Sequence, residues 1–459
     1  MTTSCLHALS SVDGRYADRL GLLSSTWSEF ALIKNRLRVE VDYLCFLSIN
    51  HFIPTFSSRE LKLLEAVVFN FDDTAALEIK KIESQIHHDV KAVEYYLRSY
   101  LQLHKIPGSE WIHIGLTSED TNSIAYGIAF RQTVTDILVP SINALLRTLC
   151  DFSVQTKDIV MLARTHGQPA VPTTIGKEVV VFAKRLADEW DRLLQLSIDA
   201  KCSGAVGTYA AQLAAFPTMD VIKMMQEFIG TFGLQPVVVT TQIVPADSYV
   251  LLFDSLRRIN TILISFNQDC WRYCSDGYFV LQSNAQDVGS STMPQKVNPI
   301  DFEQSEGNLG IANALFGHFS SKLPISRLQR DLSDSVVKRQ FGTAFGHCLL
   351  GYQSTLKGLG ILTPNTTLLS SELDDHWEII TEGIQTILRT AGDENAYEKL
   401  KALSRGKRVT KESLTAFIDS LSLPTSVKDK LHVLRPETYV GIASSLVTHT
   451  VSEIESTTT

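Results

Sequence analysis

Residues 246–275 form a stretch that contains neither proline nor glycine, and Pro245 and Asp247 supply a helix start at its beginning. At ~1.5 Å per residue, one helix over this stretch would be about 45 Å long. Its apolar residues occur on more than one side: Ile259, Ile262, Leu263, Ile264 and Phe266. A helix that is apolar all round is buried on all sides. The sequence therefore predicts a bundle of long helices, within one chain or shared between subunits.

Further long helices are expected on both sides of this stretch. Between Val179 and Leu193, apolar residues recur at steps of three and four, so they share one helical face. Residues 118–163 and 335–360 also have the pattern of long helices. Strand signals are few, and the β-rich segment 235–241 is short. These patterns predict an all-α fold.

The chain has 459 residues, which corresponds to about three domains at roughly 150 residues each. One boundary is expected near Gly115, before the long mid-chain helices, and another in the sequence LTPNTT at 362–367. The expected division is an N-terminal helical domain over 1–115, a central long-helix domain over 116–363 and a C-terminal helical domain over 364–459.

Charge and cysteine content limit the partners and the location of the protein. The net charge is -8 and the pI is about 5.9, which argues against binding nucleic acid or an anionic membrane through bulk charge. A local basic pocket for an anionic substrate is compatible with this charge. Seven scattered cysteines favour a reducing compartment over a disulfide framework. No transmembrane helix and no secretory signal are expected, so the expected location is the cytoplasm.

Residues 289–299, GSSTMPQKVNP, form the strongest candidate for a functional loop. A glycine and two serines open this segment and two prolines interrupt it, so it is neither regular helix nor regular strand. Polar loops of this length between buried helices are usually functional. The alternative is a plain surface connector.

Two other segments carry side chains that suit acid–base chemistry or carboxylate binding. His166 stands beside a glycine in RTHGQP, and a histidine titrates near neutrality, which suits an acid or base. The alternative is a structural hydrogen bond. Thr117 and Ser118 precede two acidic residues, which is a helix N-cap pattern. The same helix start would also bind a carboxylate.

Anion and metal ligands have weaker sequence signals. Arg330, Ser335 and Arg339 fall at helical or near-helical spacing and would suit a phosphate, or are solvated surface residues. Cys270 and Cys274 are interpreted as core residues, because no second Cys/His pair occurs at zinc-ligand spacing. The adjacent histidines at 87 and 88 do not share a helix face. No metal site is expected.

Taken with their order along the chain, these segments resemble one family. The 289–299 segment is similar to the shared GSSxMPxKxNP loop of the aspartase/fumarase superfamily, whose members release fumarate. RTHGQPAVPTTIGKE at 164–178 resembles the adenylosuccinate lyases, whereas fumarases, aspartases and argininosuccinate lyases carry THLQ there. Further similar segments run in family order from residue 13 to 409: DGRY, HHDVKAVEY, GLTSED, TTQIVPADSY, RDLSDS and RGKRV. The chain is identified as a member of the adenylosuccinate lyase family, in its proteobacterial form.

Three positions depart from the family pattern. Gln295 stands where adenylosuccinate lyases usually have histidine and argininosuccinate lyases have glutamine. Argininosuccinate lyase or another fumarate-releasing member of the superfamily is therefore the alternative. Ala246 replaces a common histidine, and His87 replaces a common asparagine. A non-catalytic helical scaffold is a further alternative, which the presence of serine, histidine and lysine in the two motifs disfavours.

The resemblance implies a role for each matched residue. The implied catalytic residues are Ser290 as base, His166 as general acid, Glu303 as the carboxylate partner of that histidine, and Lys296 beside a substrate carboxylate. Asn298, Thr117 and Ser118 would also contact carboxylates, and Gln242 the succinyl or base portion. The other implied contacts are Arg15, Tyr16, Arg330, Ser335 and Arg339 for phosphate and ribose, and His88, Asp89, His113, Thr165 and Met293 with less defined roles.

The resemblance also implies a reaction and an assembly. The reaction is β-elimination of fumarate from adenylosuccinate, giving AMP, and from the succinylated aminoimidazole carboxamide ribotide (SAICAR), giving AICAR, in purine nucleotide biosynthesis. The implied fold is an all-α, three-domain aspartase/fumarase-like fold. Its central long-helix bundle assembles a homotetramer with active sites shared between subunits. No metal or organic cofactor is implied, and the sequence lacks the glycine-rich patterns of dinucleotide and P-loop sites.

Overall fold

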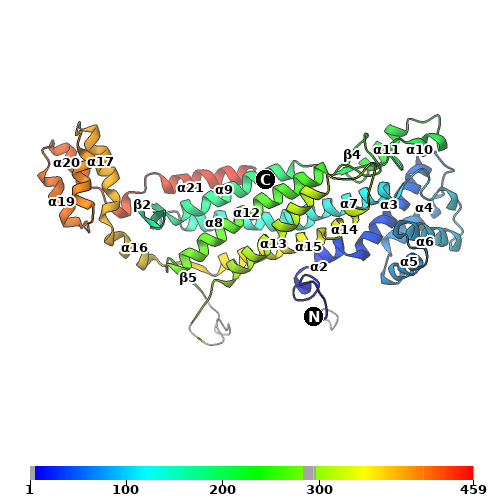
Figure 1. The fold of residues 1–459 in the computed structure, drawn as a ribbon, viewed down its shortest axis with the longest axis horizontal. Helices are drawn as coiled ribbons and strands as arrows, with labels where there is room; N and C mark the ends of the chain where they lie inside the picture. Colours follow the sequence, from blue (N-terminus) through cyan, green and yellow to red (C-terminus); the bar gives the residue numbers. More distant parts are fainter. Residues whose placement is uncertain (1–5, 283–292, 294–295, 407, 458–459) are drawn as a thin grey trace. The chain divides into compact units, whose positions relative to one another are not determined.

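The computed structural model describes residues 6–282, 293, 296–406 and 408–457 (Figure 1). The described chain is mainly helical, with three two-stranded sheets formed by β1 with β2, β3 with β4, and β5 with β6. It divides into two compact units. Unit 1 comprises Met1–Ile142, Arg192–Asn260 and Asn308–Gly351, and unit 2 comprises Asn143–Asp191, Thr261–Gly307 and Tyr352–Thr459. The three-domain division at 115 and 363 stays a prediction.

The elements of the described chain fall into three groups. Those of unit 1 are η1 (Ala17–Arg19), α2 (Gly21–Trp27), α3 (Glu29–Ile49), α4 (Ser58–Phe69), α5 (Asp73–Ile86), α6 (Asp89–Leu103), η2 (Ser109–Trp111), α7 (Ser118–Gln132), the π-helical η3 (Thr133–Leu138), β3 (Asp199–Ala200), α10 (Ala210–Ala215), α11 (Val221–Gly230), β4 (Gln235–Pro236) and α14 (Ser333–Lys338). Five long helices contribute residues to both units: α8 (Val139–Gln155), α9 (Ile175–Leu194), α12 (Asp247–Ser275), α13 (Ile300–Lys322) and α15 (Phe341–Gly360). Those of unit 2 are β1 (Val160–Thr165), β2 (Gln168–Thr174), β5 (Phe279–Leu281), β6 (Leu362–Pro364), α16 (Thr366–Asp375), η4 (Trp377–Ile380), α17 (Thr381–Thr390), α18 (Ala396–Ser404), α19 (Lys411–Ser420), α20 (Thr425–His432), η5 (Pro436–Thr438) and α21 (Ala443–Thr457).

The long uninterrupted helix predicted for 246–275 is confirmed as α12. Within unit 1, the side chain of its Phe253 is fully buried and packs at ring-centroid distances of 5.3–5.4 Å against Phe316, Phe319 and Phe341. Aromatic pairs at such distances add to the stabilisation that burial of their area provides. Of the apolar residues that the sequence indicated, Ile259, Ile262, Leu263 and Phe266 are buried, and Ile264 is half-buried.

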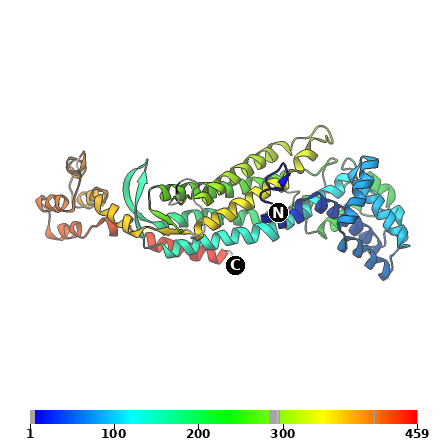
Figure 2. The same cartoon turned by 90° about the horizontal axis from the view of Figure 1, so that it is seen from below.

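The helix expected over 118–163 ends earlier than predicted, and a hairpin follows it. Helical backbone runs from Ser118 to Gln155 through α7, η3 and α8, and β1 then pairs antiparallel with β2. Figure 2 shows this hairpin as two antiparallel arrows in teal. Pro169 and Pro172 prevent a regular helix there, and Gly167, at φ 74°, supports a tight turn.

Two smaller expectations also need correction. The helix predicted for 335–360 is interrupted at Arg339 and Gln340, so that α14 ends at Lys338 and α15 begins at Phe341. Of the β-rich segment 235–241, only Gln235 and Pro236 form a strand, which is parallel to β3.

In unit 1, α3 is the helix around which the N-terminal helices pack. It contacts α2, α4, α5, α6 and α7, and Figure 1 shows it in dark blue beside cyan α7. Both α3 and α7 bury polar side chains, among them Arg36 and Glu40 on α3 and Glu119 and Asp120 on α7. Buried charges are costly unless they are paired, so these residues mark the part of unit 1 with the densest polar contacts.

Residues Ser118–Gln155 are long and apolar enough, by length and composition alone, to cross a membrane, and they are the one such helix in the described chain. The α7 part of this helix packs against α3 and buries Ile124, Ala125 and Phe130 in unit 1. Core packing therefore accounts for the apolar residues of α7.

The C-terminal helices of unit 2 bury a core of their own. Leu373, Trp377, Ile384, Leu400 and Leu414, from α16 to α19, belong to one cluster of buried apolar side chains. The orange segments in Figure 1 correspond to these helices.

Candidate active site

The residues that the sequence analysis assigned to an active site divide between the two units. Unit 1 carries Arg15, Tyr16, His88, Asp89, His113, Thr117, Ser118, Gln242, Arg330, Ser335 and Arg339. Unit 2 carries Thr165, His166, Met293, Lys296, Asn298 and Glu303. Ser290 and the departure at Gln295 lie outside the described residues.

His166 lies in the turn of the β1–β2 hairpin. Thr165 pairs with Gln168, which leaves His166 and Gly167 as a two-residue turn, with φ values of 53° and 74°. Positive φ at both central residues is the geometry that matches the twist of a hairpin. The turn is exposed, and among the described residues the His166 ring has no hydrogen-bond or ion-pair partner. A non-glycine residue in this conformation is uncommon and often belongs to a functional site.

Ion pairing holds β1 close to the turn of the same hairpin. Arg164 donates through Nη2 to Glu372 of α16, and the Tyr278 hydroxyl donates to the same carboxylate. Burial and the hydrogen bond to Glu372 raise the pKa of Tyr278 to about 12. Sequence reasoning missed Glu372 and Tyr278, because neither lies in a segment with a recognisable pattern.

The other described unit 2 candidates lie at and just before the start of α13. Lys296 is exposed, and its backbone N–H donates to the Met293 carbonyl at 3.0 Å. Asn298 is half-buried. Glu303 accepts a hydrogen bond from Trp271 Nε1 at 2.9 Å. The expected pairing of Glu303 with His166 is not seen among the described residues and stays a prediction.

In unit 1, Thr117 and Ser118 are half-buried at the start of α7, where the N-cap pattern is confirmed. Asp120 Oδ2 accepts from the Thr117 backbone N–H at 2.8 Å. The neighbouring carboxylate of Glu119 lies 3.1 Å from Arg330 Nη2 and 3.4 Å from Lys338 Nζ. Burial alone would raise the pKa of Glu119, but these two cations hold it below its usual value.

Arg330 connects Glu119 to Gln242. Its Nη1 donates to Gln242 Oε1 at 3.1 Å, and Gln242 Nε2 donates to the Ala205 carbonyl at 3.0 Å. Two residues that lie far apart in the sequence, and that the family resemblance places on the substrate, are therefore in direct contact. Ser335, on α14, donates to the Leu332 carbonyl at 2.9 Å.

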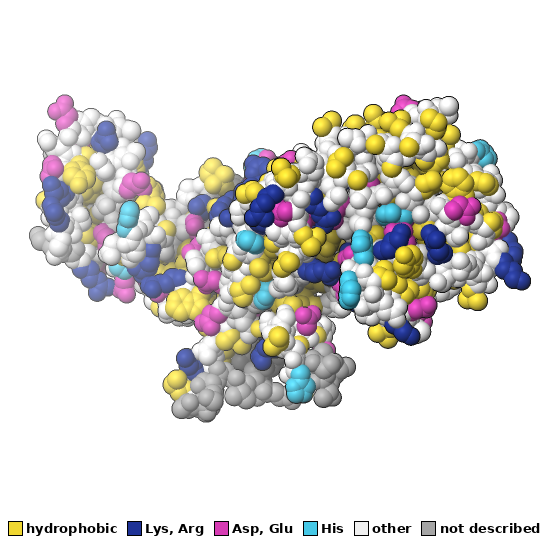
Figure 3. Space-filling model, turned by 45° about the vertical axis from the view of Figure 1, so that its right-hand side comes forward, with side chains coloured by type: hydrophobic (Ala, Val, Ile, Leu, Met, Phe, Trp, Pro, Cys, Tyr) yellow, Lys and Arg dark blue, Asp and Glu magenta, His cyan; other side chains and the backbone are white. Residues whose placement is uncertain are grey.

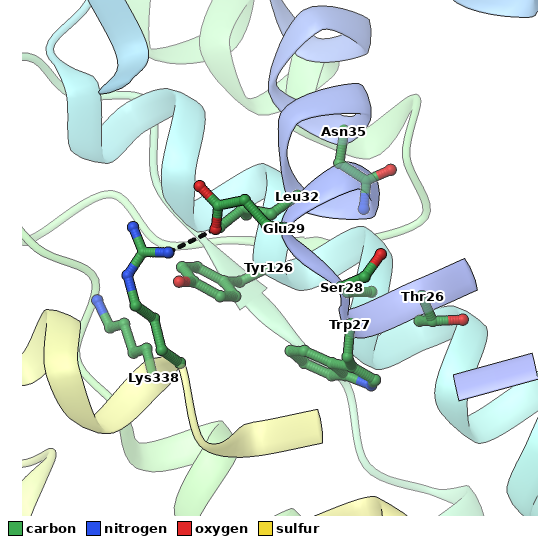
Figure 4. Close-up of a pocket in the computed structure, with 10 residues that line it drawn as sticks. Thr26, Trp27, Ser28, Glu29, Leu32, Asn35, Tyr126 and Lys338 are labelled. Carbon is green, nitrogen blue, oxygen red and sulfur yellow. Dashed lines mark hydrogen bonds and ion pairs between the residues drawn. The ribbon is translucent and has the colours of Figure 1, made fainter. Parts of the chain in front are cut away.

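Arg339 follows α14 and is held by carboxylates. Its Nη1 lies 2.6 Å from Glu29, the ion pair drawn as a dashed line in Figure 4. Its Nη2 lies 3.7 Å from Asp89. Asp89 pairs with the buried Arg36 at 2.7 Å. Burial alone would raise the pKa of Asp89, but the Arg36 guanidinium and the Val90 N–H hold it below its usual value.

Two cavities share Arg339 and Glu29. One, of about 140 Å³, is also lined by Ser28, Asn35 and Tyr126, and Figure 4 shows these side chains around it. The other, of about 430 Å³, is also lined by Asp13 and Thr343. Because Asp13 opens the DGRY segment, the structure brings this segment to the same region as Arg339. The Arg15 guanidinium lies over the Tyr16 ring, 6.0 Å from its centroid.

His113 lies between two buried carboxylates. Its Nδ1 is 2.7 Å from Glu40 Oε1, and its Nε2 is 3.8 Å from Glu94 Oε1. Burial alone would lower the pKa of His113, but Glu40 and Glu94 raise it above its usual value. A cationic imidazole suits contact with an anion.

His87 and His88 have structural roles at helix ends. His88 caps α6, where its Nδ1 accepts from the Lys91 N–H at 3.2 Å. His87 is the C-cap of α5 at φ 56°. Asparagine and histidine are both enriched in this left-handed conformation, which explains why His87 replaces a common asparagine. Ala246 is buried immediately before α12.

Sequence reasoning missed several charged residues of these contacts, because a single charge outside a recognisable segment leaves no motif: Glu29, Arg36, Glu40, Lys201 and Lys338. The described residues contain no group of three or more His, Cys, Asp or Glu side chains that would hold a metal ion. Unit 1 thus offers arginines and a histidine for an anion, and unit 2 offers a histidine and a lysine for proton transfer and charge stabilisation.

Comparisons with known proteins identify the family of the chain. Residues 35–313 match the family model described as Lyase, and residues 326–440 match the one described as Adenylosuccinate lyase C-terminal. The chain is 45% identical to the adenylosuccinate lyase of Escherichia coli (strain K12), over 97% of this chain and 99% of that protein. It is 44% identical to the adenylosuccinate lyase of Legionella pneumophila (strain Corby), with the same coverage.

Solved structures agree in fold. The chain is similar to the crystal structure of a 3-carboxy-cis,cis-muconate lactonizing enzyme from Pseudomonas putida, with TM-score 0.77 and 19% identity over 95% of this chain and 97% of that chain. It is also similar to a fumarate lyase from Mesorhizobium sp. BNC1, with TM-score 0.76 and 16% identity over the same shares. The full-length similarity to proteobacterial relatives and the two family models confirm that this chain belongs to the adenylosuccinate lyase family of the aspartase/fumarase superfamily.

Proposed function

We propose that this chain is a carbon–nitrogen lyase that eliminates fumarate from adenylosuccinate, giving AMP, and from SAICAR, giving AICAR, in purine nucleotide biosynthesis. The observation that carries the proposal is the 45% identity to an adenylosuccinate lyase over 97% of the chain. Full coverage matters here, because the proposed site draws on segments from residue 15 to residue 339.

The reaction needs a base, an acid and cations. Ser290 takes the proton from carbon, the C–N bond breaks, and His166 delivers a proton to the departing nitrogen. Lys296 and Asn298 meet the carboxylate as it gains negative charge. A serine becomes a base only when nearby donors stabilise its alkoxide and water is excluded.

The unit 1 residues would bind the anionic parts of the substrate. Arginine forks match phosphate oxygens, and Arg330 and Arg339 are held by Glu119 and Glu29. Thr117 and Gln242 would contact the carboxylates and the succinyl or base portion. The small cationic region fits an anionic substrate in a chain whose net charge is -8.

A homotetramer with active sites shared between subunits is part of the proposal. Apolar side chains on the long helices are more than 40% exposed in the single chain: Val181, Leu251, Trp271, Ile300 and Ile311. Apolar side chains also occur among charged ones over the face drawn in Figure 3. Exposed apolar surface of this kind favours contact between subunits. The exposed turn at His166 is consistent with an acid that meets substrate bound by another subunit. We place the enzyme in the cytoplasm.

The test is an assay of the purified protein with three substrates. Adenylosuccinate and SAICAR should each yield fumarate, followed by absorbance and by product chromatography, while argininosuccinate should yield none. Fumarate from argininosuccinate alone would replace this proposal with argininosuccinate lyase activity, which Gln295 favours.

A further inference from the structure

Lys201 is a fully buried lysine of unit 1 whose three donor positions are all used. Its Nζ lies 2.9 Å from Asp120 Oδ1 and donates to the carbonyls of Gly204 at 2.9 Å and Gln242 at 2.7 Å. An ammonium group has three hydrogens to donate. The three acceptors therefore fix the ammonium in one orientation.

Asp120 is as fully buried as Lys201, and its carboxylate accepts hydrogen bonds from three backbone N–H groups. It accepts from Thr117 at 2.8 Å, from Ser203 at 2.9 Å and from Gly204 at 3.1 Å. A buried ion pair adds little stability over apolar packing, whereas loss of one partner leaves an uncompensated charge. A role in stability alone therefore explains this pair poorly.

The pair joins the two segments of unit 1 that carry Thr117 and Gln242. Thr117 is bound to Asp120 through its N–H, and Gln242 is bound to Lys201 through its carbonyl. The Gln242 N–H donates to the Gln329 carbonyl at 3.2 Å, next to Arg330. The contact between Lys201 and Asp120 thus sets the relative positions of Thr117, Gln242 and Arg330, which the proposed function places on substrate.

We propose that Lys201 and Asp120 are positioning residues that hold Thr117 and Gln242 at a fixed mutual position for the lyase reaction. The inference rests on the proposed function for the substrate contacts of those two residues. The pair acts through them and exchanges no proton with substrate. The N-cap pattern explains the contact of Asp120 with Thr117 but not its contact with Lys201.

The test uses the full-length protein with Lys201→Met and Asp120→Asn, which keep side-chain length and remove one charge each. In variants with native circular dichroism and assembly, kcat/KM for adenylosuccinate should fall at least tenfold. The pH profile should keep its shape, because the pair acts through Thr117 and Gln242 and exchanges no proton with substrate. Ile384→Ala, in the buried core of unit 2, is the control for lowered stability. It should lower Tm and keep kcat/KM within twofold at a temperature where it is folded.

Hydrogen exchange provides a second measurement that needs no substrate. Backbone amides of 201–205 and 240–243 should exchange faster in Asp120→Asn than in wild type, and those of α19 should not. If Lys201→Met does not fold, Asp120→Asn decides. A folded variant with kcat/KM within twofold of wild type, or unchanged exchange in both segments, would overturn the proposal. If wild type releases no fumarate from adenylosuccinate, the proposed function fails. The hydrogen-exchange result would still decide whether the pair of Lys201 and Asp120 holds segments 201–205 and 240–243 in place.

Discussion

Arg339 Nη1 lies 2.6 Å from Glu29 Oε2, so the arginine proposed to grip the substrate phosphate is already paired with a carboxylate. If Arg339 binds the phosphate as proposed, Glu29 competes with the phosphate for this arginine. Two unit charges about 4 Å apart interact by about 1 kcal/mol in water, which corresponds to about fivefold in affinity. Glu29→Gln should thus lower KM for adenylosuccinate about fivefold and leave kcat nearly unchanged in steady-state assays.

Glu398→Gln is the matched control for this prediction, because Glu398 is also paired with a cationic side chain, that of Lys401 at 3.3 Å, and lies in unit 2. The Glu398→Gln variant should change neither KM nor kcat. A rise in KM for Glu29→Gln would mean that Glu29 orients Arg339 and does not compete with the phosphate.

The stability of the protein should depend on pH through His113. Glu40 and Glu94 raise its pKa in the folded state despite burial, so the folded protein holds this proton more tightly than the unfolded chain. The contribution is fully present below the unfolded pKa of about 6.5 and is lost as pH rises through the folded pKa. Urea unfolding at fixed protein concentration should show a free energy of unfolding that falls with pH over this window.

His113→Gln should remove that part of the pH dependence and lower stability most at the acidic end of the window. His432→Gln is the control, since His432 contacts one carboxylate, Asp419, at 3.0 Å on the surface. If the free energy of unfolding fell equally steeply with pH in wild type and in His113→Gln, His113 would not be the source of the pH dependence.

The long helices could be predicted from apolar periodicity and from the positions of proline and glycine, because helix formation depends largely on local sequence. The clearest example is α12. The β1–β2 hairpin was missed, since its prolines resemble a helix start and its pairing depends on a two-residue turn with positive φ. Motifs identified Arg330, Gln242 and Thr117. The motifs did not identify Lys201 or Glu29, because the role of a single charged residue depends on its tertiary contacts, which the sequence does not show.

Subunit mixing should test whether active sites are shared. Ser290→Ala and His166→Ala should each lose most turnover while keeping the assembled state, because each removes one proposed proton-transfer group. After dissociation and reassociation of a mixture, activity should partly return, since hybrid sites combine intact residues from different chains. Sedimentation or native mass spectrometry must verify subunit exchange. No recovery in verified hybrids would argue that each chain completes its own site.

Gly207 should tolerate no side chain, because of its contact with the Gln242 segment. At φ 77°, an added Cβ would lie 2.1 Å from the Thr240 carbonyl oxygen. Gly392 has a similar φ of 88° but no atom within 4 Å of an added Cβ. Both Gly→Ala changes incur the backbone cost of about 1–2 kcal/mol for a left-handed residue. Only Gly207→Ala must also displace the chain near Gln242, so it should lower Tm further and reduce kcat/KM at least tenfold. Equal activity of the two variants would show that the position of Gln242 does not depend on this close approach.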